Sequence, residues 1–125
     1  MTEDTVTSSR RWSIRDGARK IEFRGSLLAE SSSQRPKKPR WSELKLYRTD
    51  GGTYIVERNG RTTVDGELDY LHAYVCLTAT AVLETLYTRD EDSAFYLTNM
   101  ARAVLAKASK QDPNIRDAYY TEDVR

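Results

Sequence analysis

The chain has few of the residues from which disulfides, metal centres and enzyme active sites are built. It contains one cysteine, Cys76, and one histidine, His72, so it cannot form an intramolecular disulfide and has too few ligands for a zinc site made of cysteine and histidine. It also lacks a catalytic carboxylate pair, a nucleophile elbow, a phosphate-binding loop and a dinucleotide-binding fingerprint. We therefore expect no catalytic residue, no metal and no cofactor, and we predict that the protein is not an enzyme.

His72 and Cys76 are the only pair that resembles a nucleophile with its base. In a strand they would share one face but lie about 13 Å apart, too far for contact. In a helix they would meet, but a third group that orients the histidine would still be missing. We interpret both as structural residues, because a free cysteine usually packs as a small hydrophobe.

Long apolar runs are absent too. No run of about 18 apolar residues occurs, which predicts no membrane span, and the polar residues 1–11 predict no signal peptide. We therefore expect a cytoplasmic protein that does not bind membranes. Residues 1–10 are expected to form a disordered tail, since Val6 is the only aliphatic residue before Arg10.

Charge is unevenly distributed, although the formal net charge is only +1. Residues 1–66 hold fourteen basic and nine acidic side chains, whereas residues 67–125 hold six basic and ten acidic ones. Within residues 10–48 there are twelve Lys or Arg and four Asp or Glu. A basic block of this kind on a compact domain indicates an acidic partner.

Alternating apolar and polar residues predict strands in the first half of the chain. Trp12 and Ile14 precede the turn dipeptide Asp16-Gly17, and Ile21 and Phe23 follow it, which predicts a hairpin. Further strands are predicted from Trp41 to the Asp50-Gly51-Gly52 turn and from there to Asn59-Gly60. Residues 70–77 fit a strand or a helix, and we favour a strand because β-branched and aromatic residues dominate.

The second half predicts helices. Thr78 is placed to cap a helix over residues 79–87, and Ser93 to cap a second helix. Pro113 is placed to begin a last helical turn that ends at Ala118. The apolar stripe of the second helix recurs at helical spacing through Tyr96, Leu97, Met100, Ala101, Val104, Leu105 and Ala108.

Together these patterns predict an α+β fold: an antiparallel β-meander of three to five strands followed by two or three helices packed on one face. Residues 11–125 would form a single domain, mainly sheet over 11–77 and mainly helical over 78–119. Leu44 and Leu46 are assigned to the core. Trp41, Lys45 and Tyr47 alternate with them and are expected on the other, open face, exposed or against a second subunit.

Three segments of this predicted meander, residues 23–29 (FRGSLLA), 41–49 (WSELKLYRT) and 52–56 (GTYIV), carry a family resemblance. They resemble the meander of small actinobacterial proteins grouped as EXLDI proteins, a family with no established function. The chain ends in TEDVR and lacks the motif that names the family. The resemblance implies a small accessory protein of an actinobacterium or of its phages and plasmids, and it implies no site residue.

The segment RPKKPR, residues 35–40, is the most suggestive candidate for a contact surface. Its prolines stiffen a basic loop, which reduces the entropy that the loop would lose on binding. We expect an acidic protein partner here; a solvated loop without a partner explains the same residues. The predicted contact set is Arg35, Lys37, Lys38, Arg40, Trp41, Lys45 and Tyr47.

Two other functions are kept open. In the first, the same cations bind the phosphates of a nucleic acid while Trp41 or Tyr47 stacks on bases. In the second, Arg24, Arg48 and Arg58 converge on an anionic nucleotide. A homodimer is a further expectation, in which the acidic residues 90–92 of one copy meet the basic loop of the other.

Overall fold

The computed structural model describes residues 8–121. The main sheet contains β1 (Arg10–Asp16), β2 (Arg19–Ser32), β3 (Arg40–Thr49), β4 (Tyr54–Thr62) and β5 (Tyr70–Cys76). After it come α1 (Ala79–Leu86), the short strands β6 (Thr88–Arg89) and β7 (Phe95–Tyr96), α2 (Asn99–Ser109) and α3 (Pro113–Tyr120). The α+β prediction is confirmed, including the strand over residues 70–76. Residues 1–7 of the predicted tail lie outside the described residues, and Arg10 already belongs to β1.

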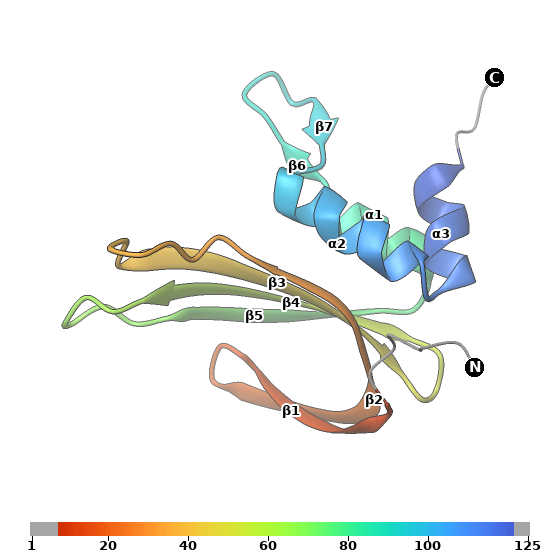
Figure 1. Cartoon of the computed structure of the whole chain (residues 1–125), viewed down its shortest axis with the longest axis horizontal. Coiled ribbons are helices and arrows are strands. Elements are labelled where there is room, and N and C mark those ends of the chain that lie inside the picture. The colour runs from red at the N-terminus through yellow and green to blue at the C-terminus, as the bar shows by residue number, and fades with distance from the viewer. Residues whose placement is uncertain (1–7, 122–125) are drawn as a thin grey trace.

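The five strands form an antiparallel meander in the order β1-β2-β3-β4-β5. The sheet curls so strongly that the β1–β2 hairpin folds beneath β3, β4 and β5, while the helices lie above them (Figure 1). At the hairpin tip the N–H of Gly17 donates to the carbonyl of Leu71 at 2.7 Å, and the N–H of Ala73 donates to the carboxylate of Asp16 at 3.3 Å. These bonds bring the first strand against the last.

The curl depends on a bend within β2, which is 14 residues long. The pairing of β2 with β3 shifts between Leu27 and Ala29, so Leu28 is an extra residue of the kind that bends a strand. Just before this bulge, Gly25 lies so close to β3 that a Cβ atom would be 2.2 Å from the carbonyl oxygen of Arg48. Glycine is therefore required where the two strands approach.

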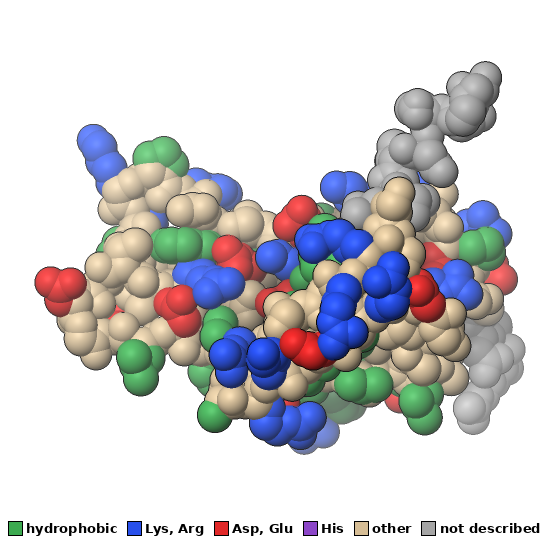
Figure 2. Space-filling model, turned by 90° about the horizontal axis from the view of Figure 1, so that it is seen from below, with side chains coloured by type: hydrophobic (Ala, Val, Ile, Leu, Met, Phe, Trp, Pro, Cys, Tyr) green, Lys and Arg blue, Asp and Glu red, His purple; other side chains and the backbone are tan. Residues whose placement is uncertain are grey.

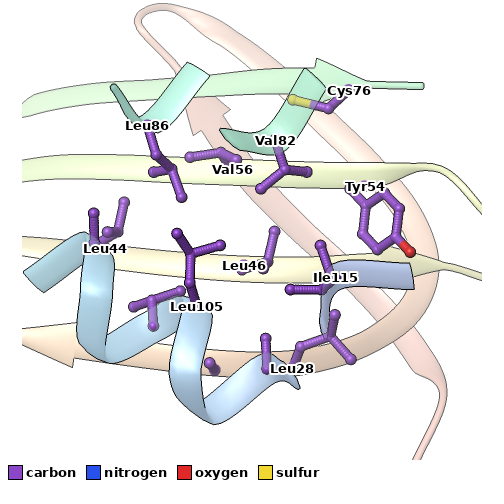
Figure 3. Close-up of a cluster of buried hydrophobic side chains, with 14 residues drawn as sticks. Leu28, Leu44, Leu46, Tyr54, Val56, Cys76, Val82, Leu86, Leu105 and Ile115 are labelled. Carbon is purple, nitrogen blue, oxygen red and sulfur yellow. The ribbon is translucent and has the colours of Figure 1, made fainter. Parts of the chain in front are cut away.

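One hydrophobic cluster lies between the upper face of the sheet and the helices. Leu44 and Leu46 are 6% and 1% exposed, which confirms their assignment to the core. Figure 3 shows strand residues pointing toward Leu105 of α2 and Ile115 of α3. Burial of large apolar side chains on this face is what holds the helices to the sheet.

A second cluster fills the inside of the curl, so the expectation of an open lower face is wrong. Tyr47 is 1% exposed, and its ring packs edge-to-face against Trp12 and Phe23 at centroid distances of 4.9 and 5.2 Å. Ile14 and Ile55 belong to the same cluster. Alternation along β3 does place Tyr47 on the other face of the sheet from Leu46, but the folded-back hairpin covers that face. Trp41 and Lys45 lie on the same face and remain half-buried.

Two of the three predicted helix starts are found. Thr78 accepts a hydrogen bond from the N–H of Ala81, and Pro113 occupies the first turn of α3. The second predicted helix does not begin at Ser93, which lies in the β6–β7 turn with φ of 65°. Asp90 accepts the N–H groups of two residues in this turn, and α2 begins only after its cap Thr98. No helix within residues 8–121 is long and apolar enough to cross a membrane.

Candidate functional site

The cations of the predicted basic loop are exposed. Arg35, Lys37 and Lys38 form no ion pair with any residue from 8 to 121. The N–H of Lys38 donates to the carbonyl of Arg35 at 3.2 Å, and Lys37 has a φ of 67°. Proline followed by a residue with positive φ is the pattern of a type II turn. The loop is thus a tight turn that presents three free cations.

The rest of the predicted contact set is less available. Arg40 donates from Nε to the carboxylate of Glu67 at 2.9 Å, and its Nη2 reaches the other oxygen. These bonds, with one from Thr62, lower the pKa of Glu67 to about 2. Lys45 lies in register between Glu30 and Glu57 on the neighbouring strands. Tyr47 is buried, so its predicted exposure is wrong.

The three arginines proposed for an anionic nucleotide do not converge. Arg24 pairs with Asp50 at 3.9 Å, and Arg48 lies 3.6 Å from the buried Asp112. Arg58 lies in the middle of β4, whereas Arg48 is opposite Tyr54 at its start, four residues before Arg58. That separation is about 13 Å along a strand.

A second positive surface is the outer face of the β1–β2 hairpin. Trp12 and Ile14 point into the curl, as do their partners Phe23 and Ile21, so the residues that alternate with them on both strands point outward. We call the four cations of this face the cationic ribbon: Arg11, Arg15, Lys20 and Arg24. Figure 2 views the molecule from this side and shows Lys and Arg side chains clustered across it.

The cationic ribbon places like charges opposite one another. Arg11 is directly opposite Arg24, and Arg15 is directly opposite Lys20. Like charges in directly opposed positions destabilise an antiparallel pair. Two carboxylates offset part of this: Glu22 accepts a hydrogen bond from Arg11 at 2.6 Å and lies 3.6 Å from Lys20, and Asp50 lies 3.9 Å from Arg24. The ribbon is therefore an exposed surface with an excess of positive charge.

Sequence reasoning counted these cations within the basic block but assigned the contact to the loop. The signal that identifies the ribbon is present in the sequence. The turn at Asp16-Gly17 fixes the register, and the apolar residues on either side of it fix which face is outward. In this register Arg11 pairs with Arg24 and Arg15 with Lys20, so the four cations lie together on the outward face.

A network of hydrogen bonds lies inside the curl, beyond the hydrophobic cluster. Glu57 is 6% exposed and accepts bonds from the phenol of Tyr47 at 2.6 Å and from the amide of Asn59 at 3.0 Å. The same amide lies 3.3 Å from Glu43, which also accepts from Arg61 at 2.9 Å. Burial opposes ionisation of Glu43, but these bonds outweigh it and lower its pKa. The network supplies hydrogen-bond donors to the carboxylates of Glu57 and Glu43 and links β3 to β4 on the inner face of the sheet.

His72 and Cys76 contact different partners. His72 Nδ1 lies 3.5 Å from a carboxylate oxygen of Asp16, whereas Cys76 Sγ lies 3.4 Å from the hydroxyl of Thr85. Burial raises the pKa of the Cys76 thiol, which reduces the fraction of reactive thiolate. Among the described residues, no group of three or more His, Cys, Asp or Glu is arranged to hold a metal ion.

Comparisons of the chain with family models, with curated proteins and with solved structures found no match. The resemblance to EXLDI proteins therefore stays a prediction. The charge and geometry of the cationic ribbon are the observations on which a function can be based.

Proposed function

We propose that the protein binds an acidic protein partner through the cationic ribbon. The observation that carries this proposal is the pair of like-charge oppositions, Arg11 with Arg24 and Arg15 with Lys20. Such pairs weaken the hairpin, so their presence on its exposed face is better explained by a contact than by stability. A carboxylate placed between two opposed cations would remove their repulsion and accept paired bonds from the arginine forks.

The free cations of the loop extend the same role. Arg35, Lys37 and Lys38 would attract an acidic surface at long range, whereas the ribbon would form the close contact. Exposed charges of this kind contribute more to the rate of association and to specificity than to affinity. Binding by this surface should therefore weaken as salt concentration rises.

Two observations favour a protein partner over a nucleic acid. The rings that would stack on bases are not freely exposed: Tyr47 is buried, and Trp41 is half-buried with its indole N–H donating to Glu43 at 3.3 Å. The C-terminal half of the chain is also acidic, with ten acidic and six basic residues, which disfavours a long polyanion lying across the molecule.

The proposal is tested with two labelled probes, a 20-residue peptide rich in Glu and Asp and a 20-base-pair DNA duplex, by fluorescence anisotropy at several salt concentrations. We expect salt-sensitive binding of the peptide, weaker binding of the duplex, and about tenfold weaker peptide binding by the double variant Arg15→Gln, Lys20→Gln. Arg102→Gln with Lys107→Gln is the matched control, since both residues are exposed on α2. Undiminished peptide binding by the ribbon variant would reject the proposal, and tighter binding of the duplex would favour a nucleic acid.

A further inference from the structure

A groove of about 510 Å³ lies on the upper face of the sheet, at the end of α2 that adjoins the β6–β7 hairpin. It lies on the side of the sheet that faces the helices, whereas the β1–β2 hairpin, which carries the cationic ribbon, lies on the opposite side (Figure 1). Its volume falls within the range of about 300–1,000 Å³ that is typical of small-molecule sites. We call it the Arg58 groove. The residues that matter for its chemistry are Leu44, Arg58, Gly60, Tyr70, Asn99 and Met100.

The walls of the Arg58 groove are mainly apolar. Leu44 and Met100 belong to the hydrophobic cluster beneath the helices or pack against it. Tyr70 is 62% exposed, and its ring is held in place by His72, with ring centroids 4.2 Å apart. A flexible methionine opposite an accessible aromatic ring suits an apolar ligand body.

Among the described residues, Arg58 is the only cation that lines the groove, and its charge is incompletely compensated. The one carboxylate in the lining, Glu43, accepts hydrogen bonds from Arg61 and Asn59 instead. Its guanidinium is half-buried and donates one hydrogen bond, from Nη2 to the carbonyl of Thr85 at 3.0 Å. No carboxylate within residues 8–121 lies within ion-pair distance of it. A guanidinium has five N–H donors, and a partly buried charge beside apolar walls is unfavourable unless it is paired.

We propose that the Arg58 groove binds a small organic carboxylate with an aromatic or aliphatic body. The carboxylate would accept hydrogen bonds from the free donors of Arg58. Its negative charge would balance the guanidinium, which no described carboxylate of the chain does. The apolar body would lie against Tyr70, Leu44 and Met100. This inference goes beyond the proposed function, because it concerns another face of the molecule and a small ligand.

The competing explanation is that Arg58 serves only to bind the end of α1, where the carbonyl of Thr85 has no partner within the helix. A single bond would then be its whole role. The two explanations differ in whether Arg58 binds an added anion, so the test compares a carboxylate ligand with the neutral amide of the same compound.

The probes are naphthalene-1-acetate and naphthalene-1-acetamide, which share one apolar body, measured by titration calorimetry and by amide chemical shifts. We expect the acetate to bind at least about tenfold more tightly than the amide, with shifts at residues 58–60 and 98–100. Arg58→Gln should remove this preference, whereas Arg58→Lys should retain part of it. Thermal unfolding of each variant shows whether it is folded.

Gly60→Val provides a second test that leaves Arg58 in place. A Cβ at Gly60 would meet Tyr70 Cβ at 3.4 Å without a positive φ, so the strand can accept the new side chain, which then occupies the groove. It should abolish binding of both probes. The ribbon variant Arg15→Gln, Lys20→Gln should bind the acetate normally, so the two proposals fail separately. The inference is overturned if the acetate does not bind at millimolar concentration, if the amide binds as tightly, or if folded Arg58→Gln and Gly60→Val proteins bind like the wild type.

Discussion

The phenolic oxygen of Tyr47 lies 2.6 Å from Oε1 of Glu57, and both side chains are buried inside the curl of the sheet. Burial and the neighbouring carboxylate raise the pKa of Tyr47 far above its usual range, so the phenol keeps its proton and remains a donor. A buried carboxylate requires such donors, because water no longer solvates it. The pair explains how β3 and β4 can each direct a polar group into an otherwise apolar interior.

Tyr47→Phe should therefore destabilise the protein by about 1–3 kcal/mol, because it retains the ring but leaves one oxygen of Glu57 without its donor. The free energy of unfolding in urea measures the effect. Tyr74→Phe is the control, since Tyr74 is 39% exposed. Equal stability of the two variants would show that the bond contributes nothing.

Asp112 joins α3 to the sheet and should be among the most sensitive positions. It is 1% exposed, caps α3 through the N–H groups of Asn114 and Ile115, and accepts a bond from the phenol of Tyr54 at 2.9 Å. Asp112→Ala is expected to cost about 3–5 kcal/mol in the free energy of unfolding, as is usual when one member of a buried charged network is removed. Asp117→Ala, at an exposed position of the same helix, should cost less than about 0.5 kcal/mol.

Gly25→Ala tests the bend of β2. The added methyl would lie 2.2 Å from the carbonyl oxygen of Arg48, a contact that only movement of the backbone can relieve. We expect a loss of about 3 kcal/mol or more, or failure to fold. At Gly51 the nearest atom to an added Cβ is 3.8 Å away, so Gly51→Ala should be tolerated. Similar thermal midpoints for the two variants would contradict the role of Gly25.

Acid stability should depend in part on Glu67. Its pKa in the folded protein is lowered to about 2, below the ordinary value of 4.5. The unfolded chain therefore takes up a proton first as pH falls, and the stabilising contribution, present above about pH 4.5, is lost between about pH 4.5 and pH 2. Glu67→Gln should show a smaller fall in unfolding free energy over this range.

Urea unfolding at pH 7 and pH 2.5 measures this difference. Glu91→Gln is the matched control, because Glu91 is exposed and forms no ion pair with a described residue. If Glu67→Gln loses as much stability on acidification as the wild type does, the bond between Arg40 and Glu67 has no role in acid stability.

Features of the fold that depend on neighbouring residues could be predicted from the sequence. The hairpin at Asp16-Gly17, the cap at Thr78 and the start of α3 at Pro113 each follow from local backbone preferences. The start of α2 could not be predicted in this way. Ser93 is a good capping residue, but Asp90 organises a competing turn and the helix begins six residues later.

The curl and both candidate surfaces depend on contacts between distant residues. Periodicity assigned Tyr47 to the face opposite Leu46, yet no local pattern shows that Gly17 will reach Leu71 and close that face. The cationic ribbon could have been predicted from the sequence, since the register of the hairpin and the inward-facing apolar residues determine which cations share its outer face. The Arg58 groove was not, because it depends on where α2 begins and how it packs over β3.

The continuity of β2 has a consequence for how the protein denatures. Its Leu28 and Ala29 belong to the cluster beneath the helices, while Phe23 and Leu27, earlier in the same strand, pack into the cluster inside the curl. Detaching this strand from one layer exposes the other. The molecule should therefore melt in one cooperative step, and neither the meander nor the helical layer should survive as an autonomous folding unit when expressed alone.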